Sequence, residues 1–137
     1  MNLASRIEVL NKVYGTSILI TQNVFERTSG LFVFRAVDRV APAGTTVPII
    51  IHELVGEAGA DAQFPVDDAV LREIESWTAF YQLYREREWA AALAALEELR
   101  GNATPRRLVA LYEDRCARFI AHPPGDDWDG VEIYESK

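Results

Sequence analysis

The sequence predicts an α+β fold in two parts, because its two halves follow different patterns. Residues 1–56 alternate between short helical and β-branched segments, whereas residues 66–120 carry apolar side chains at helical spacing throughout. Between them, residues 57–65 (EAGADAQFP) are small and acidic and have no periodicity, which is typical of a linker. We therefore predict a mixed part over residues 1–56, a linker over residues 57–65, and an all-helical extension over residues 66–137.

A helix and a short strand open the first part. Four apolar residues recur at the spacing of one helix face, namely Leu3, Ile7, Leu10 and Tyr14. Gly15 follows them as a helix stop, and the β-branched run over residues 17–21 predicts a buried strand. Residues 23–28 have room for one or two helical turns before the next turn of the chain.

Two more strands complete this part. Residues 31–40 include FVFRAVDRV, which has period-two character, and a Pro-Ala-Gly turn at residues 42–44 ends the run. Residues 47–54 predict the last strand, with Pro48 near its start, where proline is tolerated. A helix with about three strands is an α+β piece that is small for a complete domain of this type.

Three helices are predicted in the second part. Asp67 or Asp68 can cap the first of them. The second covers about residues 88–100, and Thr104 and Pro105 give the third an N-cap followed by a first-turn proline.

The first two of these helices resemble a tetratricopeptide-like hairpin. The spacing from the bulky Trp89 to the small Ala92, where two helices must approach closely, is the informative feature. Three helices amount to one and a half such units, fewer than a repeat array usually needs for stability. We therefore expect the helical part to be stabilised by contacts with another part of the protein or with a partner.

Composition narrows the classes of function. With 21 acidic and 14 basic residues, a net charge of −7 and no basic run, the chain offers no phosphate-neutralising surface, so we expect no nucleic-acid partner. The single cysteine, Cys116, excludes an internal disulfide and suits a reducing compartment. The apolar run over residues 18–20 is too short for a signal peptide or a membrane span. We expect a cytoplasmic location.

Two polar side chains lie beside the apolar stripe of the first helix. With a step of about 100° per residue, Asn2 and Arg6 lie near about 200° and 240°, and the stripe occupies about 280° to 340°. In the simpler interpretation, Asn2 caps the helix and the aliphatic part of Arg6 covers its flank. In the functional one, an amide and a guanidinium are presented together to an oxygen-rich ligand such as a phosphate.

The segments NLASRIEVLNKVYGTSILIT and FVFRAVDRVAPAGTTVPIIIHELVG resemble the C-terminal part of a class III nucleotide cyclase domain, the adenylate/guanylate cyclase family. The family motif is a Val-Asn-x-Ala-x-Arg helix, then LN…YG…ILI, an F…R…D strand and a closing V…P…YEL strand. Residues 2–56 follow this motif in register. The resemblance implies part of a ferredoxin-like cyclase domain.

The same resemblance implies roles for two residues. Asn2 matches the asparagine that orients the ribose, and Arg6 matches the arginine that stabilises the pentavalent phosphorus as the 3′-hydroxyl attacks the α-phosphate. The substrate would be ATP, with GTP as the other possibility, and the products a 3′,5′-cyclic nucleotide and pyrophosphate. The complete enzyme is a homodimer that uses two Mg or Mn ions held by two aspartates. In the family those aspartates precede the matched segment, so we expect a fragment that binds no metal and is inactive alone.

Residues 84–137 resemble the C-terminal extension of bacterial cyclases that carry an extracytoplasmic sensor of the CHASE2 type. The resemblance implies a position on the cytoplasmic side of a membrane-anchored parent, with membrane contact only through its N-terminal part. One departure from the cyclase pattern lies before the last strand. Many cyclases have Lys-Gly-Lys there, and this chain has Ala43, Gly44 and Thr45, which weakens the expected grip on the triphosphate.

Other chemically capable side chains have simpler explanations. Three aspartates match no calcium-loop spacing and predict an acidic solvated turn: Asp126, Asp127 and Asp129. His52 is expected to be a packed or edge histidine, and His122 to end a helix. Cys116 lies on an apolar helix face and is expected to be a small buried hydrophobe.

A non-catalytic function is the alternative. Residues 66–137 could form a helical interaction or dimerisation module. The apolar run WAAALAALEEL motivates this alternative, because three helices of this size leave exposed apolar surface that a partner could cover. Three tryptophans could contribute to such a surface, namely Trp77, Trp89 and Trp128. For the first two, core packing is the better explanation.

Overall fold

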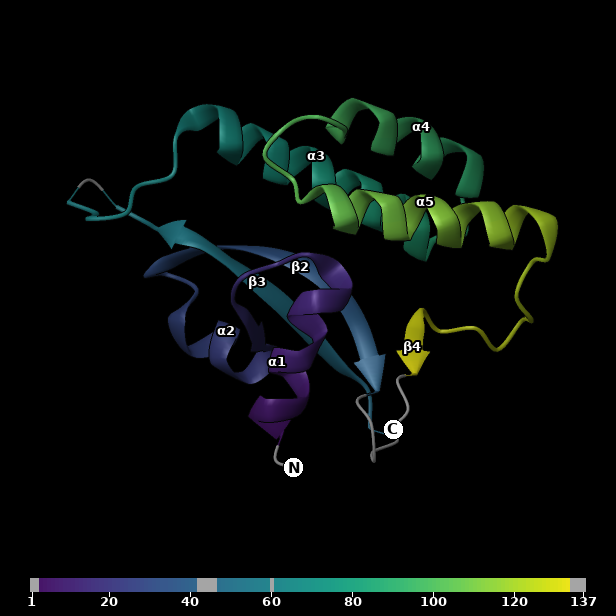
Figure 1. Ribbon diagram of the computed structural model, residues 1–137, viewed down its shortest axis with the longest axis horizontal. Coiled ribbons are helices and arrows are strands. Elements are labelled where there is room, and N and C mark those ends of the chain that lie inside the picture. Colours follow the sequence, from purple (N-terminus) through teal and green to yellow (C-terminus); the bar gives the residue numbers. More distant parts are fainter. Residues whose placement is uncertain (1–2, 42–46, 60, 134–137) are drawn as a thin grey trace. The chain divides into compact units, whose positions relative to one another are not determined.

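The computed structural model describes residues 3–41, 47–59 and 61–133 (Figure 1). Within these ranges the chain is α+β, as predicted, with five helices and one four-stranded sheet. It divides into two compact units, Met1–Asp67 with Gly130–Lys137 and Asp68–Asp129. None of the described helices is both long and apolar enough to cross a membrane.

The first unit contains the elements predicted for residues 1–56, in the predicted order. Its helix stops at Gly15, whose φ of 73° is left-handed and whose N–H donates to the Asn11 carbonyl at 2.8 Å. The elements are α1 (Leu3–Tyr14), β1 (Leu19–Thr21), α2 (Gln22–Thr28), β2 (Phe32–Ala41), β3 (Ile49–Glu57) and β4 (Val131–Ile133). β1 was expected to be buried, but all three of its residues are half-buried, because β1 lies at the edge of the sheet.

The strands pair in the order β1-β3-β2-β4. β3 is antiparallel to both of its neighbours, and β4 runs parallel to β2, with Val131 opposite Arg39. These last residues were expected to belong to the helical extension, and about three strands were predicted. The fourth strand was missed because three residues are too few to show a period-two pattern.

Two bulges offset each other in the β2–β3 ladder. The register passes over Val55 of β3, because Val33 pairs with Gly56 and Phe34 pairs with Leu54. It likewise passes over Val37 of β2, between Ala36 and Asp38. After the second bulge the original register returns. Burial along β2 follows this change, since Arg35 and Val37 are buried and then Asp38 is buried as well.

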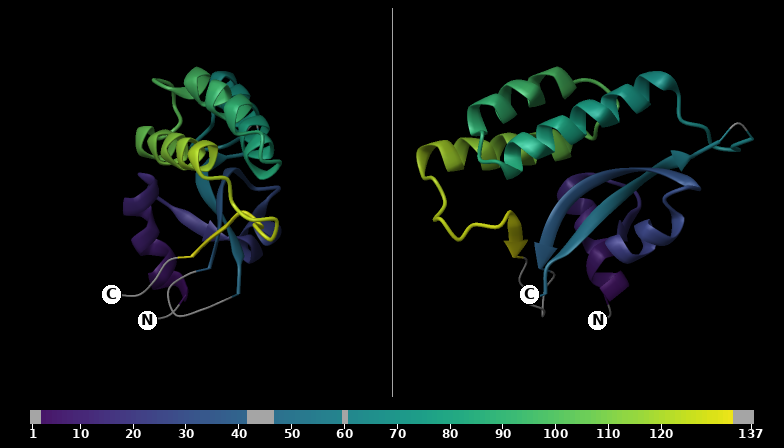
Figure 2. Two further views of the ribbon diagram at one scale, coloured as in Figure 1. Left: turned by 90° about the vertical axis from the view of Figure 1, so that its right-hand side faces the viewer. Right: turned by 180° about the vertical axis from the view of Figure 1, so that it is seen from behind.

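The two helices of the first unit contact opposite faces of the sheet (Figure 2). Arg35 and Glu53 are direct partners across β2 and β3 and therefore share one face, whereas the neighbouring His52 points to the other. The Tyr14 side chain of α1 reaches the first face, and the Phe25 ring of α2 stacks on His52 on the second. The first face, under α1, holds the unit's most deeply buried residues.

Phe64 and Pro65, at the end of the predicted linker, pack against the end of β3. Glu57 pairs with Pro65 in an isolated bridge, and its N–H donates to the Phe64 carbonyl at 2.9 Å. A Cβ atom built on Gly56 would lie 2.4 Å from the Val66 side chain and 2.9 Å from the Phe64 carbonyl oxygen. The end of the segment predicted to be a linker therefore packs against the sheet, and only glycine fits at position 56.

The second unit consists of α3 (Asp68–Arg85), α4 (Trp89–Leu99) and α5 (Arg106–Ala121), which run successively antiparallel (Figures 1 and 2). Ala92 is fully buried, as the hairpin spacing predicts. Thr104 was expected to cap α5, but that helix starts one residue later than predicted, with Pro105 at the cap position and no side-chain cap bond. The Thr104 side chain is buried instead.

An aromatic core fills the second unit. Trp77, Phe80, Tyr84 and Tyr112 are each at most 1% exposed. Trp77 packs against Phe80 with ring centroids 4.9 Å apart, and Tyr84 meets Tyr112 edge to face at 4.9 Å. The Trp77 prediction of core packing is confirmed.

Candidate functional site

The two predicted catalytic residues belong to the start of the first unit. Asn2 lies outside the described residues. Arg6 is part of α1, and its side chain also lies outside the description. On the helical wheel, position 6 falls between the buried Leu10 and the half-buried Val13, using about 100° per residue. Position 6 is therefore at the margin of the buried stripe of α1.

A hydrogen bond ties the C-terminal end of α1 to the sheet. The Tyr14 hydroxyl donates to the Asp38 Oδ2 atom at 2.6 Å, and both residues are 0% exposed. The Arg39 backbone N–H donates to the other carboxylate oxygen at 2.8 Å. A buried carboxylate is tolerated when such donors replace water, so this bond is part of the core.

The Val37 bulge is what aims Asp38 at α1. In a regular strand, side chains alternate between faces, so Asp38 would point away from the face that Arg35 and Val37 occupy. The extra residue in β2 shifts that alternation by one, and Asp38 then lies opposite Ile51 on the face under α1. From the sequence alone, Tyr14 belongs to the apolar stripe of α1, and Asp38 has no assigned role. The signal was the phase break in FVFRAVDRV, where two consecutive apolar residues (Ala36 and Val37) precede two consecutive charged residues (Asp38 and Arg39).

A buried ion pair lies on the same face. Arg35 and Glu53 bond through their side chains and are 2% and 13% exposed. Burial raises the pKa of the Glu53 carboxyl, and the charge and hydrogen bond of Arg35 oppose that rise. This pair, like the Tyr14–Asp38 bond, was not assigned from the sequence.

His52 lies on the opposite face and is a packed side chain, as predicted. Its ring stacks on Phe25 with centroids 4.1 Å apart, and its Nε2 atom lies 2.5 Å from Oε1 of Gln22. The residue is 6% exposed, and burial lowers its pKa from 6.5 to about 4. His52 is therefore neutral at physiological pH.

The second unit places the remaining candidates. Cys116 is fully buried, and burial raises the pKa of its thiol to about 11, so the prediction of a small buried hydrophobe is confirmed. The three C-terminal aspartates, Asp126, Asp127 and Asp129, are exposed. Trp128 packs on Trp89 at 5.2 Å and under the Arg87 guanidinium at 5.5 Å. Its ring therefore belongs to the aromatic cluster that continues from the unit's core.

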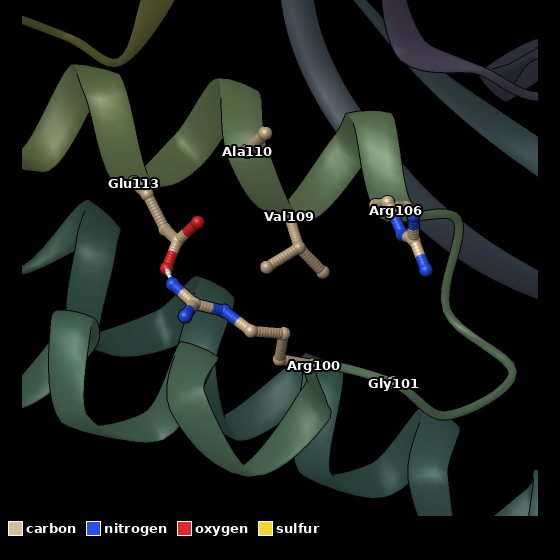
Figure 3. A pocket seen from close by; sticks show the side chains of 6 residues that line it. All are labelled: Arg100, Gly101, Arg106, Val109, Ala110 and Glu113. Atoms are coloured by element: carbon tan, nitrogen blue, oxygen red, sulfur yellow. Dashed lines mark hydrogen bonds and ion pairs between the residues drawn. The ribbon is translucent and has the colours of Figure 1, made fainter.

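An open pocket lies between the end of α4 and the start of α5 (Figure 3). Its volume is about 280 Å³, and Val109 and Ala110 contribute apolar surface. Arg100 and Glu113 point toward each other and form an ion pair, and Arg106 stands at the other end (Figure 3). The pocket holds no residue of the predicted cyclase site.

Nowhere in residues 3–41, 47–59 and 61–133 do three His, Cys, Asp or Glu side chains gather as ligands. Ala43 and Thr45, at the positions of the usual lysines, lie outside the described residues.

Comparison with known proteins gives no assignment. Neither the models of protein families nor the curated proteins nor the solved structures contain a match to this chain.

Proposed function

We propose that residues 2–56 supply one half of the active site of a class III adenylate cyclase, which converts ATP to 3′,5′-cyclic AMP and pyrophosphate for signal transduction. Asn2 orients the ribose, and Arg6 stabilises the negative charge that develops on the α-phosphate as the 3′-hydroxyl attacks. The aspartates that bind the metal ions come from a second cyclase domain across a dimer interface.

The observation that carries the proposal is the in-register match of residues 2–56 to the cyclase motif. Two features of the fold support it. The elements follow the order helix, strand, short helix, strand, strand, and the motif places its helix before its two named strands in the same order. Position 6 falls at the margin of the buried stripe of α1, next to the fully packed Ile7.

Arginine and asparagine suit these roles chemically. A guanidinium is always charged, and its planar fork binds two phosphate oxygens at once, so it stabilises the transition state more than the ground state when it is positioned in advance. The asparagine amide both donates and accepts, which matches a ribose hydroxyl or ring oxygen. In the complete enzyme, metal ions would supply activation of the 3′-hydroxyl and neutralisation of the triphosphate.

A complementation assay tests this proposal. The partner is a class III cyclase domain that retains its metal-binding aspartates and has alanine at the counterparts of Asn2 and Arg6. We expect no cyclic AMP from ATP and Mn²⁺ with either protein alone, and product from the mixture. Product from the isolated 137-residue chain, or none from the mixture at any ratio, contradicts the proposal.

A second candidate function concerns Asp68–Asp129. These residues form a compact unit with its own aromatic core and contain neither Asn2 nor Arg6, which favours an interaction or dimerisation module. Leu71 and Ile120 are large apolar side chains of this unit that are 38% and 49% exposed. If the module mediates association, Leu71→Glu or Ile120→Glu weakens it in sedimentation of the full chain with a cyclase domain. A monomeric wild-type chain that never co-sediments contradicts this function.

A further inference from the structure

We propose that Tyr14 and Asp38 are positioning residues, which fix the rotation and axial register of α1 and thereby the placement of Arg6. The inference rests on the proposed cyclase function. It assigns a role to a hydrogen bond that joins the catalytic helix to the sheet and that makes no contact with substrate.

The geometry singles out this bond. Tyr14 and Asp38 are both 0% exposed, and their oxygen atoms are 2.6 Å apart. The second carboxylate oxygen is held by the Arg39 N–H, so the acceptor is itself fixed. On the helix side, the chain turns at Gly15 directly after the tyrosine, and the Thr16 hydroxyl donates to the Asn11 side chain at 2.7 Å. Further hydrogen bonds therefore hold the chain at both ends of the Tyr14–Asp38 bond.

Apolar packing alone would leave α1 less well defined. Ile7 and Leu10 are buried against the sheet, but such contacts are non-directional and tolerate small rotations and slips of a helix. A short hydrogen bond to a buried carboxylate has a narrow range of distances and angles. Tyr14 and Asp38 thus supply the directional constraint that Ile7 and Leu10 lack.

The β2 bulge supports a dedicated role. If β2 kept Val37 as an ordinary paired residue, with no bulge, strand alternation would direct Asp38 to the face of His52, away from α1. Bulges often occur next to functional sites, where they re-aim a side chain. Here the re-aimed side chain is the one that holds the helix bearing Arg6.

The constraint acts at the distance of about two helical turns. Tyr14 lies eight positions after Arg6, which is about 12 Å at about 1.5 Å per residue. A helix held at one end transmits a rotation to the other end as a rigid element. Because a misplacement of about 1 Å can cost about 10²-fold in rate, loss of this bond should affect turnover far more than substrate binding.

Hydrogen exchange of the full chain tests the anchoring independently of function. Tyr14→Phe removes only the hydroxyl, and Asp38→Asn retains one acceptor oxygen and serves if the first variant folds poorly. We expect amide exchange over residues 7–14 to rise about tenfold in Tyr14→Phe, with exchange of β3 unchanged. Tyr112→Phe deletes the same atom from an equally buried tyrosine of the second unit and should leave α1 exchange as in wild type. Unchanged α1 exchange in Tyr14→Phe overturns the inference.

The complementation assay supplies the kinetic test. With the metal-bearing partner domain in excess, Tyr14→Phe should lower kcat about tenfold or more and leave KM for ATP within about twofold. Asp38→Asn should lower kcat less than Asp38→Leu does. A rise of KM with unchanged kcat would contradict a positioning role. If the wild-type mixture makes no cyclic AMP, the proposed function fails and the catalytic part of this inference fails with it. The exchange result then still decides whether Tyr14 and Asp38 anchor α1.

Discussion

Arg35 of β2 and Glu53 of β3 stand directly opposite each other and form a buried ion pair on the face of the sheet under α1. Removing one partner leaves the other charge buried without compensation. We therefore expect Glu53→Leu or Arg35→Met to lower the free energy of unfolding by about 3–5 kcal/mol each. The double variant should lose less than either single one, because no orphaned charge remains. Urea unfolding of the four proteins measures this coupling, and simple additivity of the two losses would contradict it.

The close approach of the linker predicts that position 56 tolerates no side chain. In Gly56→Ala the new Cβ would meet Val66 and the Phe64 carbonyl, so we expect a loss of about 1–3 kcal/mol from strain where residues 64–66 pack on β3. Gly30→Ala is the matched control, since a Cβ there meets nothing within 4 Å. Thermal unfolding of the two variants compares them. Equal melting temperatures would mean that residues 64–66 do not pack on β3.

Burial of neutral His52 predicts an acid-sensitive contribution to stability. Its pKa is about 4 in the folded chain and 6.5 as the ordinary value. As the pH falls, His52 therefore takes up a proton in the unfolded chain before it does so in the folded chain. The free energy of unfolding that His52 contributes above pH 6.5 is lost as the pH falls toward about 4, by roughly 3 kcal/mol in all. His52→Gln should remove this dependence, and His122→Gln, at an exposed position, should retain it.

The contribution of Glu53 to stability changes with pH in the opposite direction to that of His52. The two contributions must therefore be separated by comparing variants. The pKa of Glu53 is raised from 4.5, so its contribution is present at low pH and is lost as the pH rises through the raised folded value. Subtracting the unfolding free energy of His52→Gln from that of wild type at each pH isolates the histidine. A flat difference between pH 4 and 6.5 would show that His52 is accessible to protons in the folded state.

Much of the first unit could be predicted from local sequence signals. The apolar stripe of α1 and Gly15 defined a helix whose observed end agrees with the prediction. The β-branched and alternating runs defined three strands. These signals succeed because side-chain periodicity and the backbone preference of glycine act over a few residues.

The features that organise the candidate site depend on pairing between distant segments. The role of Asp38 follows from a bulge, and a bulge is visible only once β2 is aligned with β3. The strand at Val131–Ile133 exists because the edge of β2 is free to accept it. Thr104 has the residue type of an N-cap, but tertiary packing buries its side chain and leaves that bond unmade. Periodicity carries none of this information.

The most direct test of the central claim is the rate of cyclic AMP formation by the complemented mixture with Arg6→Ala. Arg27→Ala is the control, because this arginine of α2 is exposed and the cyclase motif assigns it no role. If Arg6 stabilises the transition state, Arg6→Ala lowers turnover by about 10²–10³-fold and Arg27→Ala leaves it unchanged. A rate for Arg6→Ala equal to that of the wild-type mixture would contradict the account.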